Sequence, residues 1–209
     1  MKLGLIRHGE TVFNREERMQ GVRDIELSDL GRQQAIELGR LLRQEECAPP
    51  QLYSSPVKRA LDTATLLGVT TNIIAHPGFR ARSLGSLEGL TKSEIREKFP
   101  GAFERLVEWD YLPPGANETL RDIYTRANTA VEELVQRESE ADQELVIVVT
   151  HSGVLEALLR GWMQISAGQK LPVPLKNAGV FWLERPESGS SWVFTGSLAV
   201  GEQGTLDLA

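Results

Sequence analysis

Two histidines and two arginines of this sequence have the types and positions that phosphoryl-transfer chemistry needs. Arg7 and His8 come directly after a short apolar run, His151 comes directly after a β-branched run, and Arg59 lies in a helical pattern behind a Ser-Ser-Pro turn. A neutral imidazole can attack phosphorus, and guanidinium groups can hold phosphate oxygens in pairs. The four residues therefore predict a site for a phosphoryl group, with one histidine as the nucleophile and the other as a donor to the oxygens.

Each of these residues also has an ordinary structural interpretation when it is taken alone. A histidine at the end of a strand is more often a polar residue with satisfied hydrogen bonds than a catalyst, and an arginine such as Arg59 is usually a solvated residue of a helix. A metal site would need several carboxylates near the histidines, and none cluster there in the sequence. The combination of the four residues favours function, and we predict neither a metal nor a cofactor.

The elements that must bring these residues together alternate between strands and helices. Residues 2–6 and 144–150 are continuous apolar runs, which are typical of central strands covered on both faces, and residues 51–55 and 70–75 predict further strands. The alternation predicts the α/β class, as a three-layer sandwich with a mostly parallel central sheet flanked by helices. In such sheets ligands bind beyond the carboxyl ends of the strands, where both histidines lie.

Capping residues mark the predicted helix starts. Ser28 and Thr119 are typical N-cap residues, and Pro56 suits a first helical position. Residues 90–136 are rich in helix formers but are interrupted twice by proline and glycine. We therefore predict that this segment is a helical insertion that packs over the edge of the sheet as a lid.

The C-terminal part predicts a hairpin that closes the sheet. Residues 180–184 and 192–197 alternate apolar residues with others around a turn-forming segment, and the residues from Gly201 on have little apolar pattern. We expect a loose tail there. The edge of the hairpin is where a second copy would pair if the protein forms a homodimer.

The composition of the 209-residue chain is that of an ordinary globular protein, with 41% hydrophobic and 25% charged residues, and we predict one domain over residues 1–209. The formal net charge of −6 disfavours nucleic acid and anionic membranes as partners. No apolar stretch reaches the length of a membrane span or of a secretory signal. Because Cys47 is the one cysteine, no intrachain disulfide can form, and we expect a cytoplasmic protein.

Six motifs are spread over the chain: Arg7-His8-Gly9-Glu10-Thr11 with Asn14, Gln20-Gly21, Leu27-Ser28-x-x-Gly31-x-x-Gln34-Ala35, Ser54-Ser55-Pro56-x-x-Arg59-Ala60-x-x-Thr63-Ala64, Gly85-x-x-Glu88-Gly89 and Thr150-His151-Ser152-Gly153. The run Arg-His-Gly-Glu alone would be a modest signal, and it becomes a strong one in register with the Ser-Ser-Pro-x-x-Arg block and the second histidine. With these motifs the sequence resembles, over nearly its whole length, the histidine phosphatase (phosphoglycerate mutase-like) superfamily.

The resemblance implies a role for each matching residue in a site that needs no metal. His8 would form a phosphohistidine, and Arg7, Arg59 and His151 would hold the phosphoryl oxygens. Asn14, the backbone at Gln20 and Gly21, and the amide of Ser152 would border the substrate. An unperturbed histidine has a pKa of about 6.5, so His8 would be largely uncharged and able to attack at neutral pH. The turn at Asn177 also resembles a family turn near the pocket, although an ordinary turn explains it equally well.

One position departs from the family pattern. The family usually has a glutamate four residues before the glycine that aligns with Gly85, and this glutamate protonates the leaving oxygen; here that residue is Ala81. General acid catalysis contributes roughly 10² to 10⁴ in rate, so turnover of substrates with poor leaving groups should be impaired while binding is retained. Three explanations are open: a Glu→Ala variant, which we favour, a replacement acid at Glu88 or Glu10, or a natural member with low activity.

The expected activity is hydrolysis of a small phosphorylated metabolite. Phosphoglycerate mutases of the family are generally longer and carry a pair of adjacent arginines in the lid, and residues 90–111 contain no such pair. Arg80 and Arg82 flank the acid position and are our candidates for contacts with an anionic substrate. A mutase-type phosphotransferase and a non-catalytic binder of phosphorylated ligands are the alternatives.

Overall fold

The computed structural model describes residues 1–44, 51–141, 143–186, 191–200 and 206–208. Within them a seven-stranded sheet has the order β3-β2-β4-β1-β5-β6-β7. The strands are β1 (Lys2–Arg7), β2 (Gln51–Ser54), β3 (Ile73–Ala75), β4 (Leu145–Thr150), β5 (Gly179–Glu184), β6 (Val193–Val200) and β7 (Leu206–Leu208). The four strands β3, β2, β4 and β1 run parallel, and β5, β6 and β7 add an antiparallel half.

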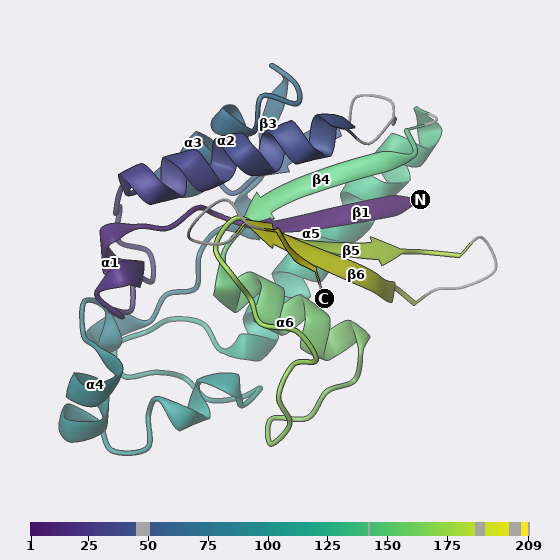
Figure 1. The fold of residues 1–209 in the computed structure, drawn as a ribbon. Coiled ribbons are helices and arrows are strands. Elements are labelled where there is room, and N and C mark those ends of the chain that lie inside the picture. The colour runs from purple at the N-terminus through teal and green to yellow at the C-terminus, as the bar shows by residue number, and fades with distance from the viewer. Residues whose placement is uncertain (45–50, 142, 187–190, 201–205, 209) are drawn as a thin grey trace.

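Helices cover both faces of this sheet, which confirms the predicted three-layer sandwich (Figure 1). The helices α2 (Asp29–Gln44) and α3 (Lys58–Leu67) lie on one face, and α5 (Leu120–Glu140) and α6 (Ser152–Trp162) lie on the other. The short elements are α1 (Val12–Arg15), α4 (Lys92–Lys98) and the 3-10 turns η1 (Pro77–Phe79), η2 (Gly85–Leu87) and η3 (Glu104–Val107).

The central strands are apolar on both sides because each side faces a separate core. Leu5 and Val148 pack with α5 and α6 in one cluster, whereas Ile6 and Val149 pack with α2 and α3 in another. Alternate residues of one strand point to opposite faces, so a strand covered twice needs apolar residues throughout. This packing fixes β1 beside β4.

The caps predicted for α2 and α5 are present, and the start predicted for α3 is wrong. The Ser28 hydroxyl accepts a hydrogen bond from the amide of Gly31 at 3.0 Å, and Thr119 forms a capping box with Asp122. Helix α3, however, begins at Lys58 and not at Pro56. The amide of residue 57 donates to the Ser55 hydroxyl at 3.2 Å, which keeps this segment in a turn for two more residues.

The predicted insertion of residues 90–136 divides into two parts. Helix α4 and turn η3 lie beside a small third cluster that contains Leu87, Ile95 and Ala102, apart from the sheet. Helix α5, by contrast, buries Ile123 and Val131 in the main core under the sheet. The lid therefore ends before Thr119, and the second half of the predicted insertion is a layer of the sandwich.

The C-terminal hairpin is confirmed, and the expectation of a loose tail is wrong where the structure describes it. Strands β5 and β6 pair antiparallel, and β7 pairs with β6. Residues 201–205 and 209, the rest of the predicted tail, lie outside the described residues. The hairpin edge that we expected to be open to a second copy is covered by β7. No helix in the described part of the chain has the length and apolar content that a membrane span requires.

The contact between α2 and α3 yields a test of the packing. A Cβ added at Gly39 would lie 1.9 Å from the carbonyl oxygen of Leu67, a backbone atom that cannot rotate away. We expect Gly39→Ala to lower the free energy of unfolding by about 2 kcal/mol, because the added methyl must push the helices apart. Gly168→Ala, with nothing within 4 Å of its new Cβ, is the control and should change it by less than about 0.5 kcal/mol. Urea denaturation measures both, and equal effects would contradict the packing.

Candidate active site

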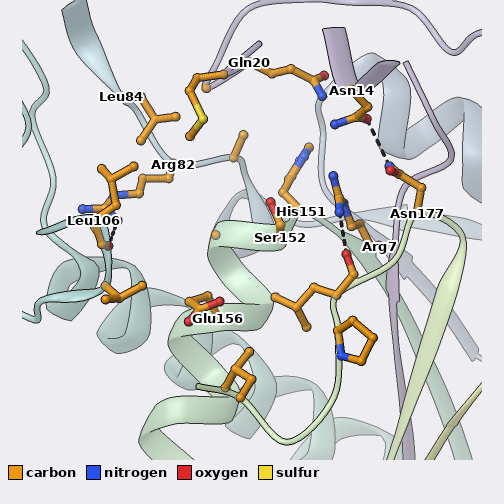
Figure 2. Close-up of a pocket in the computed structure, with 18 of the residues that line it drawn as sticks. Arg7, Asn14, Gln20, Arg82, Leu84, Leu106, His151, Ser152, Glu156 and Asn177 are labelled. Carbon is orange, nitrogen blue, oxygen red and sulfur yellow. Dashed lines mark hydrogen bonds between the residues drawn. The ribbon is translucent and has the colours of Figure 1, made fainter. Parts of the chain in front are cut away.

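A cavity of about 950 Å³ opens beyond the carboxyl ends of β1 and β4. The register pairs Arg7 with Thr150, so the residues that follow the two strands, His8 and His151, come together. All ten of the site residues predicted from the sequence line this cavity: Arg7, His8, Asn14, Gln20, Gly21, Arg59, Ala81, Arg82, His151 and Ser152. Figure 2 shows how the labelled members surround the opening, with Arg7, Asn14 and Asn177 on one side and Arg82 and Leu106 on the other.

His8 is held in one tautomer by two hydrogen bonds. Its ring is 3% exposed, its Nδ1 lies 2.7 Å from the carbonyl oxygen of Gly9, and its Nε2 lies 3.2 Å from Nε of Arg59. A carbonyl oxygen can only accept and a guanidinium can only donate, so Nδ1 carries the proton and Nε2 presents its lone pair. The ring is therefore a neutral imidazole whose lone-pair nitrogen is Nε2.

The surroundings also keep the proton off this ring. Burial lowers the pKa of His8 well below 6.5, and the positive charges of Arg59 and Arg7 lower it further, against a smaller opposite effect of the bond to Gly9. His8 is neutral at pH 7 as a result. Burial also lowers the pKa of Arg7 and of Arg59 to about 10, which leaves both guanidinium groups charged at that pH.

Backbone carbonyls, and not carboxylates, anchor the two arginines. Arg59 donates from Nη1 to the carbonyl of Arg23 and from Nη2 to the carbonyl of Gly21, each at 2.8 Å. Arg7 donates from Nη1 to the carbonyl of Leu175 at 2.5 Å. Among the described residues neither arginine forms an ion pair with a carboxylate. Their charge is therefore free to meet an anion in the cavity.

His151 forms the other part of the cavity floor at the start of α6. Its ring is 4% exposed, and its centroid lies 5.3 Å from that of His8. Its Nε2 is 2.8 Å from the hydroxyl of Ser55, whereas its buried Nδ1 has no partner among the described residues. Burial lowers the pKa of His151 well below 6.5, and the positive charge of Arg59 adds to the effect. Both imidazoles are thus neutral beside two charged guanidinium groups.

Asn177, which the sequence left undecided, fastens the backbone of the first motif. Its side-chain amide donates to the carbonyl of His8 at 3.0 Å, to that of Gly9 at 3.3 Å and to Oδ1 of Asn14 at 3.1 Å. Asn14 Oδ1 also accepts from the amide and hydroxyl of Thr11. Asn177 therefore positions the chain that carries His8, a role that its turn sequence alone does not distinguish from an ordinary turn.

Position 81 presents only a methyl group to the cavity. Ala81 is 2% exposed. Glu88 accepts from the amides at positions 22 and 84 and does not line the cavity, and Glu10 accepts from the Ser28 hydroxyl. Neither of the replacement acids considered from the sequence faces the site.

Sequence reasoning missed the two carboxylates that do line the cavity, Glu17 and Glu156. Glu156 lies on the turn of α6 that follows Ser152 and forms an ion pair with Arg160 at 2.7 Å. Its spacing of four residues from Ser152, on the same helix face, was the available signal. Glu17 has a backbone φ of 54°, a value that the sequence does not reveal.

The two arginines that flank position 81 have different surroundings. Arg80 does not line the cavity and forms an ion pair with Glu118, so the structure gives no support to its predicted contact with substrate. Arg82 lines the cavity at 6% exposure, and it donates to the lid carbonyls of Leu106 at 2.6 Å and Tyr111 at 3.3 Å. Burial lowers its pKa to about 10, and its Nε has no partner among the described residues.

Among the described residues no group of three or more histidine, cysteine, aspartate or glutamate side chains is placed to hold a metal ion. The part of the cavity lined by Arg7, Arg59, His8 and His151 is instead suited to an anion, with the N-terminus of α6 beside it, and the carboxylates Glu17 and Glu156 line other parts of the wall. Such an arrangement can bind a phosphoryl group and offer it a neutral imidazole nitrogen as a nucleophile.

Comparison with known proteins also indicates phosphoryl chemistry. A sequence profile of the histidine phosphatase superfamily, branch 1, matches residues 3–196. A metal-independent phosphoserine phosphatase of Arabidopsis thaliana is 37% identical over 80% of this chain and 71% of that protein. A glucosyl-3-phosphoglycerate phosphatase of Mycobacterium tuberculosis is 37% identical over 75% of this chain and 73% of that protein. The solved structure of a mycobacterial glucosyl-3-phosphoglycerate phosphatase with VO3 has a TM-score of 0.81 at 31% identity, and covers 92% of this chain and 96% of that one.

The electrostatics of His8 can be tested without any substrate. Arg59→Met removes the neighbouring charge with the largest effect on His8, so the pKa of His8 should rise toward 6.5 while burial still holds it below that value. The ring ¹⁵N shifts, followed from about pH 4 to pH 8, measure the change. Arg40→Met, which breaks an exposed pair with Glu37, is the control and should leave His8 unchanged. A His8 that titrates at 6.5 or above in the unaltered chain would contradict the neutral nucleophile.

Proposed function

The chain belongs to the histidine phosphatase superfamily, and from that membership we propose that it is a phosphomonoesterase that hydrolyses a small phosphorylated metabolite through a phosphohistidine on His8. One observation carries the proposal. His8 lines the cavity, and its Nε2 lone pair accepts a hydrogen bond from Nε of Arg59. The half-buried Arg7 and the buried Arg59 line the same cavity, both charged and neither in an ion pair with a carboxylate of the described residues. A phosphoryl dianion bound there would lie beside two positive guanidinium groups and beside the imidazole nitrogen that attacks phosphorus.

The proposed reaction has two steps, and both use the same nitrogen. In the first, Nε2 of His8 leaves its bond to Arg59 and attacks phosphorus, and the ester P–O bond breaks with its electron pair on the leaving oxygen. In the second, water attacks the phosphohistidine, the P–N bond breaks with its electron pair returning to Nε2, and both protons of the water leave with the phosphate as H2PO4−. Arg7, Arg59 and His151 offset the charge on the phosphoryl oxygens in both steps.

The leaving oxygen needs a proton unless it is stable as an anion, and Ala81 cannot supply one. We propose that this chain therefore turns over substrates with poor leaving groups slowly, by a factor of roughly 10² to 10⁴. A Glu→Ala change at position 81 is our preferred explanation. Glu88 accepts hydrogen bonds from backbone amides and Glu10 accepts one from the Ser28 hydroxyl, and neither lines the cavity. This supports the explanation, because neither of these two glutamates of the motifs can replace the acid.

Five further residues are proposed to border the substrate: Asn14, Gln20, Gly21, Arg82 and Ser152. Gln20 is 8% exposed with its Oε1 unpartnered among the described residues, and the amide of Ser152 lies at the N-terminus of α6. The relatives named for phosphoserine and for glucosyl-3-phosphoglycerate act on compounds that carry a carboxylate beside the phosphate ester. Arg82, a buried cation without an ion pair in the described chain, is our candidate for holding such a carboxylate.

We also propose that the protein works in the cytoplasm and that neither nucleic acid nor membrane is its partner. The net charge of −6 repels polyanions over most of the surface, while the local charge of the cavity admits one small anion.

Rapid-quench labelling with an aryl phosphate tests the intermediate. An acid-labile phosphoryl group should appear on His8 within one turnover and then be lost as inorganic phosphate, and His8→Ala should take up no label. Intact-mass and peptide mass spectrometry locate the group. Transfer of the group to a second hydroxyl of a substrate would indicate a mutase. No label in this chain or in Ala81→Glu would indicate a non-catalytic binder and would contradict the proposal.

Restoring the acid tests the role of position 81. Ala81→Glu should raise kcat/KM for alkyl phosphates by roughly 10² to 10⁴, because their leaving oxygens need a proton, and should raise it much less for p-nitrophenyl phosphate. Ala141→Glu, at an exposed position outside the cavity, is the matched control and should change neither. A gain that is equal for both kinds of substrate would exclude a role in protonating the leaving group.

A further inference from the structure

Ser55, which has no part in the function proposed so far, lies behind His151 at the end of β2. It is fully buried, with 0% exposure. Its hydroxyl oxygen lies 2.8 Å from Nε2 of His151 and 3.2 Å from the amide nitrogen of Val57. A backbone amide can only donate, so the hydroxyl oxygen accepts a hydrogen bond from Val57. The remaining question is which of the two side chains donates in the bond between Ser55 and His151.

The two neutral tautomers of His151 leave different numbers of buried polar groups without a hydrogen-bond partner. With the proton on Nε2, the ring would donate to Ser55, the serine hydroxyl proton would lack an acceptor, and the lone pair of Nδ1 would lack a donor. With the proton on Nδ1, the Ser55 hydroxyl donates to Nε2, and the Nδ1–H is the one group left without a partner. Each unpaired buried polar group destabilises the folded state, so the second tautomer, which leaves one such group and not two, is favoured.

We propose that Ser55 is a positioning residue that fixes His151 as the Nδ1–H tautomer, so that a neutral N–H donor is available to a phosphoryl oxygen in the cavity. This inference rests on the proposed function only for the identity of the acceptor. His151 lines the cavity and its Nε2 is bonded to Ser55, so Nδ1, which is buried and has no partner among the described residues, is the ring nitrogen that remains for a ligand.

One hydrogen bond on each ring thereby gives the two histidines opposite roles, an acceptor on His8 and a donor on His151. The carbonyl of Gly9 takes the Nδ1 proton of His8 and leaves an acceptor on Nε2, whereas the hydroxyl of Ser55 fills Nε2 of His151 and leaves a donor on Nδ1. Neither ring needs to be protonated for its task. A neutral donor also avoids a third positive charge beside Arg7 and Arg59, which burial and these charges disfavour.

Nitrogen NMR of the full-length protein near pH 7 tests the tautomer directly. Long-range ¹H–¹⁵N correlations should show a protonated Nδ1 and an unprotonated Nε2 for His151. A protonated Nε2 in the unaltered chain would overturn the proposal, whether or not any variant folds. Ser55→Ala should allow the Nε2–H tautomer to become populated. Ser54→Ala is the matched control, since Ser54 is equally buried and donates to the carbonyl of Ser55, and it should leave His151 as Nδ1–H.

The affinity for inorganic phosphate tests whether the tautomer of His151 matters for binding in the cavity. Ser55→Ala should weaken phosphate binding about tenfold and lower kcat for p-nitrophenyl phosphate by a similar factor, while Ser54→Ala should stay within about twofold. Ser55→Thr, which keeps the hydroxyl, should restore both the tautomer and the affinity. Unchanged phosphate affinity in a folded Ser55→Ala protein would overturn the proposal. Failure of the proposed function is a separate result, because the tautomer is measured without turnover and the phosphohistidine is not needed for it.

Discussion

Two desolvated guanidinium groups without an ion pair in the described chain, that of the buried Arg59 and that of the half-buried Arg7, are the constraint on which the rest of the site depends. A buried cation is costly unless its surroundings compensate it, and here the compensation comes from backbone carbonyls, those of Gly21 and Arg23 for Arg59 and that of Leu175 for Arg7. Carbonyl dipoles fix the direction of a guanidinium but leave its net charge in place. Asp24 and Glu88 stabilise the charge of Arg59 without an ion pair to it, so the cavity still favours an anion. Burial first, and then the same positive charges, keep the two histidines neutral.

The scaffold supplies this arrangement through strand register and through a few side-chain bonds between distant motifs. Pairing of β1 with β4 places both histidines at one edge of the sheet, and Asn177 fastens the backbone around His8 from a loop near the other end of the chain. Ser55 and Arg59 come from the same turn and helix, and each of them contacts one of the two imidazoles. Motifs that are far apart in sequence are thus connected in pairs by hydrogen bonds, which explains why they form a site only together.

The sequence predicted much of this because its strongest signals are local. Continuous apolar runs identified β1 and β4, capping residues identified the starts of α2 and α5, and the residue types after the strands identified the anion site. The errors arose where a residue's partner lies far away in the chain. Arg80 has the right type and neighbourhood for a substrate contact, but Glu118 holds it elsewhere, and the two carboxylates that line the cavity, Glu17 and Glu156, carry no motif. The division of residues 90–136 between lid and core likewise depends on which face of the sheet α5 covers, a tertiary choice that helix propensity does not encode.

A phosphoryl site formed by the desolvated guanidinium groups predicts that a bound anion stabilises the folded protein, and thermal unfolding measures this stabilisation most directly. Inorganic phosphate should raise the Tm of the unaltered chain above its value in chloride of equal ionic strength, because a ligand that binds only the folded state stabilises it. Arg59→Met should abolish most of that increase, since it removes one of the two guanidinium charges without an ion pair in the described chain. Equal Tm values in phosphate and chloride for the unaltered chain, or an undiminished increase in Arg59→Met, would contradict the central claim that the desolvated guanidinium groups form a phosphoryl site.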